Sequence, residues 1–254
     1  MKNLAVLIQA RMGSTRLPNK VLADIEGKPM IWHLVNRLSQ SKFSPEIIIV
    51  TTILKEDKQI IEFGKELNLK VYAGNCDDVL DRYYQASLKY NVDIIVRITA
   101  DCPLIDPEVF DIVVTKFLDG NYDYFTNTLP PTYPDGLDVE VFSFQALEKS
   151  WNEAMLSSER EHVTPYIRKN PQIFKLGNIE SEVDLKDMRW TVDEKEDLQF
   201  VREIFKKLYS KGNVFLMEEI LDLLKEHPEL MKINNQFERN EGYLKSLRED
   251  RIIK

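Results

Sequence analysis

Short apolar runs that alternate with amphipathic segments are the feature that most constrains the fold of this chain. Four runs rich in valine and isoleucine are bounded by turn or charged residues, at 4–8, 46–52, 69–73 and 93–99. Because they are apolar at successive positions, they are typical of strands that are buried on both faces of a parallel sheet.

Amphipathic segments separate these runs. Apolar residues recur at helical spacing in 29–41, 57–68 and 78–90. A repeated order of strand and helix predicts right-handed βαβ units. We therefore expect an α/β fold with a doubly wound, mostly parallel sheet flanked by helices.

The pattern changes after about residue 125. A turn-rich segment at 129–136 precedes 137–142, where apolar and acidic residues alternate. This alternation predicts an antiparallel or edge strand with one face in solvent. We expect a small antiparallel insertion at about 129–170.

The last hundred residues predict further elements. Segment 157–167 begins like a helix, with Ser158 and Glu161 in the spacing of a capping box. A last strand is predicted at 188–192, followed by an amphipathic helix at 193–210 whose acidic first turn complements the helix dipole.

We expect a division of the chain into one domain and an appendage. A single domain over 1–210 suits the length of 254 residues better than two equal domains. Residues 211–254 are predicted to form a helical extension, because the tail from about Glu226 is charged and weakly patterned.

Composition excludes several classes of protein. The chain is 43% hydrophobic and 30% charged, as in soluble globular proteins, and its net charge of −8 argues against binding to nucleic acid. Cys76 and Cys102 are too few for a disulfide framework and predict free thiols in a reducing compartment. Because no run is long enough for a membrane span, we expect a cytoplasmic protein without a membrane partner.

A basic loop directly follows the first apolar run. It contains Arg11, Gly13, Ser14, Arg16 and Lys20. In parallel α/β sheets ligands bind beyond the carboxyl ends of the strands, and this loop leaves a strand at that end. The loop matches neither the Walker A nor the dinucleotide-binding motif. Its cations suit a triphosphate, whose developing charge they would neutralise, although a solvated basic turn has the same composition.

Two aspartates follow other predicted strands. Asp101 comes after run 93–99, and Asp193 comes after 188–192. Mg²⁺ on a nucleotide is commonly held by one or two carboxylates together with phosphate oxygens, so the pair could grip one metal ion. Each aspartate could instead cap a turn or a helix, and Asp106 before Pro107 is better explained in that way.

Several motifs, taken together and in order, carry a resemblance to a known family. They are QARMGSTRLPNKVL, DVLDRYYQA, VRITADCPLIDP, TYPDGLDVEVFS, EREHVTPYI and RWTVDEKEDL, within residues 3–208. The chain closely resembles the cytidylyltransferases, especially their spore-coat polysaccharide branch, which is related to the enzymes that make CMP-activated Kdo and sialic acids. The resemblance implies a Rossmann-like nucleotidyltransferase fold with a mixed sheet and a homodimer.

The resemblance also implies a reaction and a set of residues. CTP and an acidic sugar or phosphorylated acceptor would give a CMP- or CDP-linked product and pyrophosphate. Arg11, Lys20 and Asp101 would be catalytic, and Asp101 and Asp193 would bind Mg²⁺. The implied nucleotide-binding residues are Ala10, Arg11, Met12, Gly13, Ser14, Arg16, Lys20, Asn75, Asp78 and Arg82.

Residues for the acceptor are expected in two later segments. Carboxylates can bind sugar hydroxyls, and Arg160 could pair with an anionic group of the acceptor. A solvated strand face would explain the same acidic residues. The candidates for acceptor binding are Tyr133, Asp135, Asp138, Glu140, Arg160 and His162.

Two other functional classes would share part of this pattern. A glycosyltransferase of related fold should carry an Asp-x-Asp metal motif after a strand, whereas Asp101 and Asp106 are five residues apart. A non-catalytic nucleotide sensor would need the basic loop but not both aspartates. Because no serine, cysteine or histidine has a base and an orienting group in evident reach, we expect direct in-line attack of the acceptor on the α-phosphorus.

Overall fold

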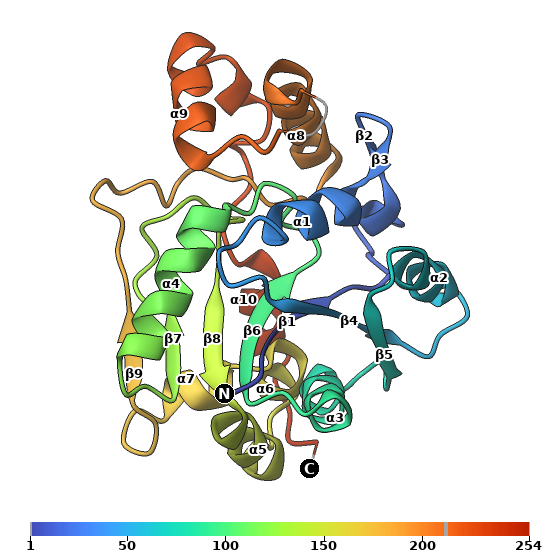
Figure 1. Ribbon diagram of the computed structural model, residues 1–254, viewed down its shortest axis with the longest axis vertical. Coiled ribbons are helices and arrows are strands. Elements are labelled where there is room, and N and C mark those ends of the chain that lie inside the picture. Colours follow the sequence, from blue (N-terminus) through green and yellow to red (C-terminus); the bar gives the residue numbers. More distant parts are fainter. Residues whose placement is uncertain (1, 211–212, 254) are drawn as a thin grey trace.

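The computed structural model describes residues 2–210 and 213–253, and its centre is a seven-stranded sheet with the order β5-β4-β1-β6-β8-β7-β9 (Figure 1). Four neighbouring strands are parallel, and they coincide with the four apolar runs. These strands are β1 (Leu4–Gln9), β4 (Glu46–Thr52), β5 (Lys70–Gly74) and β6 (Ile94–Thr99). The predicted parallel half of the sheet is confirmed.

The other half makes the sheet mixed. Strand β8 (Glu140–Ser143) is antiparallel to both β6 and β7 (Tyr124–Thr126), whereas β9 (Leu176–Asn178) is parallel to β7. A separate antiparallel pair consists of β2 (Asp24–Ile25) and β3 (Lys28–Pro29). The expected mostly parallel mixed sheet is therefore present.

Helices cover both faces of the sheet. One face is covered by α1 (Met30–Leu38), α2 (Lys58–Glu66) and α4 (Pro107–Asp119). The opposite face is covered by α3 (Val79–Tyr90), α5 (Phe144–Glu153), α6 (Ser157–His162) and α7 (Pro165–Lys169). Figure 1 shows α4 and α5 in these two layers.

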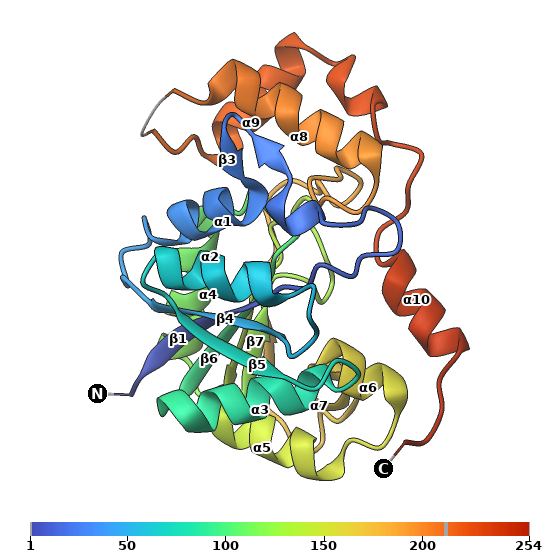
Figure 2. The same ribbon diagram turned by 90° about the vertical axis from the view of Figure 1, so that its right-hand side faces the viewer.

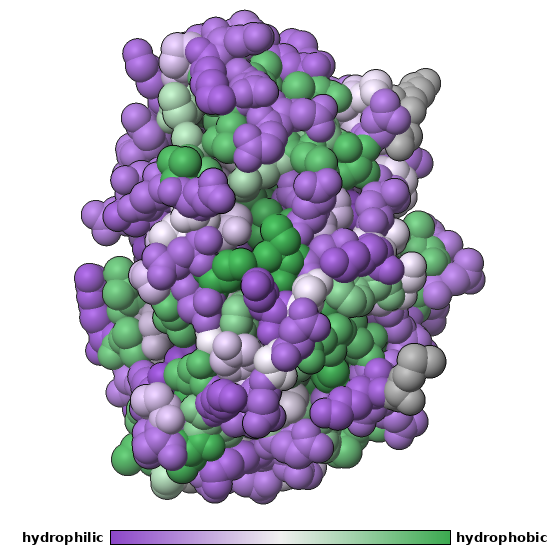
Figure 3. All heavy atoms as spheres, turned by 60° about the vertical axis from the view of Figure 1, so that its left-hand side comes forward, coloured by the Kyte–Doolittle hydropathy of each residue, from purple (hydrophilic) through white to green (hydrophobic). Residues whose placement is uncertain are grey.

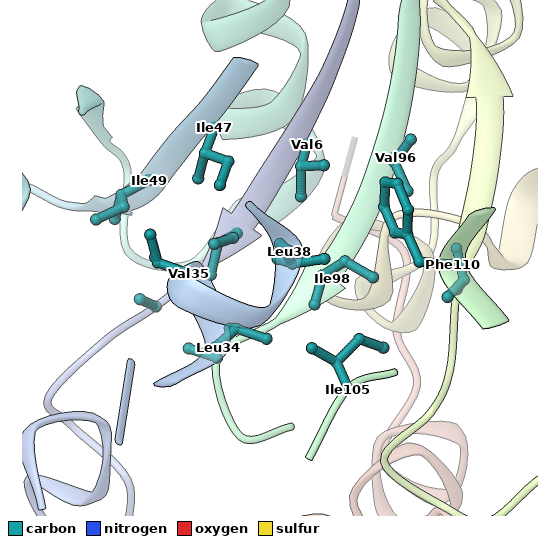
Figure 4. Packing of buried hydrophobic residues seen from close by; sticks show 14 of the residues in the cluster. Val6, Leu34, Val35, Leu38, Ile47, Ile49, Val96, Ile98, Ile105 and Phe110 are labelled. Carbon is teal, nitrogen blue, oxygen red and sulfur yellow. The ribbon is translucent and has the colours of Figure 1, made fainter. Parts of the chain in front are cut away.

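Successive residues of β1 explain why the runs are continuously apolar. Val6 and Ile8 pack into the cluster under α1, α2 and α4, which Figure 4 shows from close by. Ala5 and Leu7 pack into the cluster on the other face. Because side chains alternate across a strand, a strand with helices on both faces needs apolar residues at every position.

A third apolar cluster lies above the carboxyl ends of the parallel strands. It contains α8 (Lys195–Leu208) and α9 (Met217–Glu226), together with η2 (Leu230–Lys232) and residues of the β2–β3 pair. From this lobe the chain runs down one side of the molecule as α10 (Glu241–Arg248) (Figure 2). The predicted boundary between 210 and 211 borders on residues outside the described ranges, so it stays a prediction.

The predicted strand at 188–192 is wrong. Only Arg189 forms a bridge, to Asp135, and it stands alone. The Val192 N–H donates to the Asp101 carbonyl at 2.8 Å, so the segment crosses the strand ends and does not join the sheet.

The acidic alternation at 137–142 was also misread in part. The strand is antiparallel as predicted, but β8 lies inside the sheet between β6 and β7. Glu140 is buried on the face that also holds Tyr124 and Phe142, so this face is not in solvent. Its acidic residue is tolerated because Arg97 of the neighbouring strand pairs with it.

The expected helix at 157–167 is two helices. Val163 has φ of 71° and separates α6 from α7. The carboxylate that caps α6 belongs to Glu159, which accepts from the N–H of Leu156 at 3.2 Å, so the predicted capping box of Ser158 and Glu161 is wrong. Cys76 and Cys102 are free thiols, as expected. None of the helices in the described residues is both long and apolar enough to cross a membrane.

Candidate active site

A cavity of about 910 Å³ opens where β1 and β6 end. Its walls come from six segments: the basic loop after β1, the end of β6 with the turn that follows, the start of β8 with the preceding loop, α6 and α7, the segment 189–193, and the C-terminal residues 240–249. The parallel strands deliver the first two segments to the same edge of the sheet, as expected for α/β proteins.

Lys20 lies at the centre of the charged groups in this cavity. The residue begins the short helix η1 (Lys20–Leu22), and its Nζ donates to Asp101 at 3.1 Å and to Asp193 at 2.7 Å. A third bond reaches the Val192 carbonyl at 2.7 Å. The two predicted metal aspartates, which are 92 positions apart, therefore converge on one ammonium group.

These contacts shift the pKa values of Lys20 and Asp101. Burial alone would lower the pKa of Lys20, but attraction by Asp101 and Asp193 outweighs it and raises that pKa above its usual value. Burial opposes ionisation of Asp101, yet Lys20 and the Thr99 hydroxyl lower its pKa to about 2. The groups are therefore charged across the physiological range of pH.

Two arginines of the basic loop lie on either side of this cluster. Arg11 is exposed and lines the cavity, and within the described residues its guanidinium has no ion pair. Arg16 pairs with Asp193 at 2.9 Å and with Glu194 and Glu241 at 3.2 Å. The predicted cationic loop thus faces the cavity with Arg11, Ser14, Arg16 and Lys20.

An aspartate that the sequence analysis missed holds the loop. Asp57, just before α2, is 1% exposed and accepts from the Met12 N–H at 2.7 Å and from the Thr52 hydroxyl. Met12 itself is buried, and Ala10, Met12 and Gly13 are not among the residues that line the cavity. No local pattern marks Asp57, because its partner lies 45 residues earlier in the chain.

The residues predicted to read the base do not line the cavity. Asn75, Asp78 and Arg82 lie at the start of α3 and next to β5, where Arg82 is fully buried and donates to the carbonyls of Asn75 and Cys76. Asp78 caps α3 by accepting from the Asp81 N–H at 2.9 Å.

Asp78 and Arg160 bind each other, although they were predicted to bind different substrates. Arg160 is 5% exposed, and its Nη2 lies 2.6 Å from Asp78 Oδ2. Its Nη1 donates to the Trp151 carbonyl at 2.8 Å. Arg160 is therefore a buried link between α6 and α3 and does not line the cavity, so its position does not support the predicted contact with the acceptor.

Four of the predicted acceptor residues do line the cavity, namely Asp135, Asp138, Glu140 and His162. Glu140 pairs with Arg97 and accepts from the hydroxyls of Tyr124 and Thr164, both at 2.6 Å. Although burial favours the protonated acid, Arg97 outweighs it and lowers the Glu140 pKa.

The pKa values of Asp135 and Asp138 are shifted in the opposite direction, upward. Burial and the neighbouring Asp138 raise the pKa of Asp135 to about 7, and burial also raises the pKa of Asp138. Arg239 pairs with both carboxylates, and its Nε lies 3.7 Å from Asp135 Oδ1. Asp135 is therefore partly protonated near neutral pH.

Tyr133 lies elsewhere. It packs with Leu137 and Trp190 in the third apolar cluster and lines a second cavity, not the charged one. Figure 3 shows apolar side chains gathered on the side of the molecule that includes α4. The prediction that Tyr133 covers a sugar is not supported by this position.

Arg189 connects the two ends of the charged cavity and was also missed. Its guanidinium lies 2.9 Å from Asp197, 3.3 Å from Asp193 and 3.4 Å from Asp135. Asp197 is fully buried and also accepts from Asn234 at 2.9 Å. The motif RWTVDEKEDL contains Arg189 and Asp197, but their pairing becomes visible only when the segment turns into α8.

The two converging aspartates fit a divalent cation. Within the described residues no group of three or more histidine, cysteine or acidic side chains forms a complete metal site. Asp101 and Asp193 nevertheless reach one common point, which Lys20 Nζ takes. Two carboxylates with phosphate oxygens and water are a suitable donor set for Mg²⁺.

Known proteins share both the sequence and this fold. A family model described as cytidylyltransferase matches residues 5–242. The spore coat polysaccharide biosynthesis protein SpsF of Bacillus subtilis is 31% identical over 236 residues, covering 90% of this chain and 97% of that protein. A solved cytidylyltransferase from Leptospira borgpetersenii has a TM-score of 0.87 and 34% identity, covering 91% of this chain and 97% of its own.

A more distant structure shares the fold alone. The CMP:2-keto-3-deoxy-manno-octonic acid synthetase complexed with CTP has a TM-score of 0.63 at 20% identity, covering 82% of this chain and all of that one. The family model spans most of the chain, including the basic loop, both converging aspartates and Arg189. This protein therefore belongs to the cytidylyltransferase family and is a nucleotidyltransferase.

Proposed function

We propose that this protein transfers CMP from CTP to an acidic sugar or phosphorylated acceptor, with release of pyrophosphate, in the biosynthesis of a cell-surface or spore-coat polysaccharide. The observation that carries the proposal is the position of Lys20 between Asp101 and Asp193, beside Arg11 and Arg16. SpsF and the synthetase complexed with CTP support the pathway and the nucleotide.

The triphosphate would bind along the basic loop. Arg11 is exposed at the cavity and makes no ion pair in the described part of the chain, so it is available to a phosphate. Lys20 and Arg16 already contact carboxylates that a metal-bound nucleotide would neutralise, which would free both cations for phosphate oxygens. The cations then stabilise the charge that develops at the α-phosphorus and on the departing pyrophosphate.

Asp101 and Asp193 would hold the metal in this proposal. A bound Mg²⁺ would supply Lewis-acid polarisation of phosphate oxygens. The chain's own part is to bring the two carboxylates together, through the bond between the Val192 N–H and the Asp101 carbonyl.

The acceptor would approach from the end of the cavity that contains Asp135 and Asp138. These carboxylates can accept hydrogen bonds from sugar hydroxyls. Attack of an acceptor oxygen on the α-phosphorus in line with the departing pyrophosphate needs no covalent intermediate with the enzyme. A carboxylate or phosphate oxygen would attack in its ionised form, while a hydroxyl would first have to lose its proton.

The test is a pyrophosphate-release assay with each nucleoside triphosphate, Mg²⁺ and a panel of acidic and phosphorylated sugars. We expect release with CTP and one class of acceptor, and little with UTP. Binding of CTP without release in any combination would contradict the enzyme activity. Consumption of a nucleotide sugar without pyrophosphate would instead indicate a glycosyltransferase. A cytoplasmic location and a homodimer belong to the same proposal, and light scattering tests the dimer.

A further inference from the structure

The C-terminal segment 238–249 forms a wall of the charged cavity. Its helix α10 has no buried residue, and Leu244 and Leu247 are 42% and 37% exposed. Figure 2 shows α10 along the side of the molecule between the lobe of α8 and α9 and the region of α6. Burial of apolar surface therefore does little to hold α10 at this place.

Polar contacts hold α10 instead, and they lead to both ends of the cavity. At one end Glu241 pairs with Arg16 at 3.2 Å. At the other end the Ser246 hydroxyl lies 3.0 Å from His162 Nε2 and donates to Glu161 at 2.7 Å.

The chain after α10 is anchored on α6. The Asp250 carboxylate accepts from the Ser158 N–H at 3.0 Å and from the hydroxyls of Ser157 at 3.0 Å and Ser158 at 2.8 Å. A backbone bond between the Ile253 N–H and the Met155 carbonyl, at 2.9 Å, extends this anchor. The helix thus crosses the cavity between fixed points.

Two cations that line the cavity next to α10 make no ion pair within the described residues, although Glu140 lies near enough to Arg168 for the two charges to attract each other. Arg168 of α7 places its guanidinium 5.3 Å from the centre of the Tyr243 ring, and among the described residues this guanidinium makes no ion pair or hydrogen bond. Lys245 of α10 also lines the cavity, is exposed, and makes no ion pair within the same ranges. Arg97, by contrast, is paired with Glu140.

His162, which also lines the cavity beside α10, is neutral mainly because it is buried. Burial lowers its pKa to about 4, Glu161 opposes the shift, and Arg97 and Arg168 lower the pKa further. The imidazole is therefore neutral at pH 7 and can share its proton with a hydroxyl of Ser246 or of a ligand.

We propose that Arg168 and Lys245 bind the anionic group of the acceptor, a carboxylate or a phosphate, and that α10 thereby sets acceptor specificity. The inference rests on the proposed function, because it concerns the second substrate of that reaction. Stacking on Tyr243 orients the planar guanidinium, which is suited to bind two oxygens of one anionic group.

Kinetics of pyrophosphate release with three variants test this site. The variants are Arg168→Gln, Arg168→Lys and Lys245→Gln, and the matched controls are Lys169→Gln on α7 and Arg248→Gln on α10, which do not line the cavity. The acceptors are 2-keto-3-deoxy-manno-octonic acid, glucose 1-phosphate and glucose, so the carboxylate and the phosphate are tested in separate arms.

We expect Arg168→Gln to raise the KM for the anionic acceptor about tenfold or more, with the KM for CTP within twofold of the wild type. Lys245→Gln should have a smaller effect of the same kind, Arg168→Lys should restore part of the affinity, and both controls should match the wild type. Wild-type turnover with unchanged acceptor KM in the variants would overturn the inference and leave the proposed function intact. A loss confined to CTP would overturn it as well.

If the wild type shows no turnover, the proposed function is contradicted, but the anion site at Arg168 and Lys245 is not. In that case, shifts in the melting temperature with the same three sugars show whether the site binds an anionic sugar. A shift with an anionic sugar that Arg168→Gln loses and Lys169→Gln keeps supports the site. No shift in the wild type at the highest sugar concentration overturns the inference too.

Discussion

The two ends of the charged cavity are built in different ways. The end with Lys20, Asp101 and Asp193 lies on loops that leave the buried strands β1 and β6 directly or are bonded to them. The other end combines β8, α6, α7 and α10. The first and the last of these elements are more than 100 residues apart in the chain. The first end is fixed by the core, and the second by contacts between distant segments.

The two ends should therefore differ in how easily they open locally. Loops on a doubly covered sheet inherit the rigidity of its apolar clusters, whereas α10 is attached by exposed polar contacts. Segments with few buried apolar contacts open at a lower free-energy cost than core strands. The comparison suggests a rigid site for the reacting phosphates and an adaptable wall for the acceptor, and the following changes test it in order of expected effect.

The loss of the buried ion pair between Asp197 of α8 and Arg189 should have the largest effect. Asp197→Ala leaves Arg189 buried without its closest partner and removes one of the two acceptors of the Asn234 amide. We expect the free energy of unfolding to fall by about 3–5 kcal/mol, as for other broken buried pairs. Urea denaturation measures this, with Glu196→Ala on the same turn of α8 as the control. A loss below about 1 kcal/mol would show that the cavity does not depend on this ion pair.

Removal of one charge from the rigid end should mainly change turnover. Asp101→Asn keeps the shape of the side chain but removes a charge that pairs with Lys20 and, in the proposal, with the metal. We expect kcat to fall by about 10²–10³-fold. Thermal unfolding should show a folded protein, and Asp77→Asn, an exposed change outside the cavity, is the control. Near-normal kcat would remove Asp101 from the active site.

His162 gives a pH test of the adaptable end. Unfolded histidine takes up a proton below about pH 6.5, whereas folded His162 does so only near its pKa of about 4. The unfolded state therefore binds more protons between these values, and the free energy of unfolding should fall as the pH falls through this window. Asp135, with a pKa raised to about 7, makes the free energy of unfolding rise as the pH falls, which opposes the effect of His162. The quantity to measure is therefore the difference in the free energy of unfolding between the wild type and His162→Gln at each pH.

We expect the wild type to lose about 1–2 kcal/mol more than His162→Gln between pH 6.5 and pH 4. The estimate is below the full linkage value because the side chain is 24% exposed. Urea denaturation at several pH values measures it. If the free energy of unfolding changes with pH in the same way in both proteins, the pKa of His162 is not lowered in the folded state.

Loss of the ion pair between Glu241 of α10 and Arg16 should have the smallest effect, a slight change in the affinity for CTP. Glu241→Gln removes the partner of Arg16 on α10, in a pair whose side chains are 35% and 40% exposed. Exposed pairs contribute less than about 1 kcal/mol, and Arg16 keeps its pairs with Asp193 and Glu194, so CTP should bind at most about twofold more tightly. Calorimetric titration with CTP measures the change, and Glu249→Gln on the same wall is the control. Weaker binding of CTP would mean that Glu241 supports the nucleotide site.

Several errors of the sequence analysis have one cause. Asp78 and Arg160 were assigned to different substrates because each stands in a polar motif, yet they are 82 residues apart and satisfy each other. Glu140 was placed on a solvent face because its strand alternates, but Arg97 of β6 covers it. Polarity in a sequence marks a need for a partner and does not say whether that partner is water, a ligand or another segment.

The sequence by itself determined the parallel core, the helices that cover it, and the positions of the cationic loop and of Asp101 just beyond the ends of β1 and β6. These features follow from the periodicity of apolar residues and from the rule that loops after parallel strands share one edge of the sheet. The tertiary structure alone decided that Lys20 joins both aspartates, that Arg160 leaves the cavity, and that α10 becomes its wall. Such pairings depend on distances between remote segments, which exist only once the apolar core has brought those segments together.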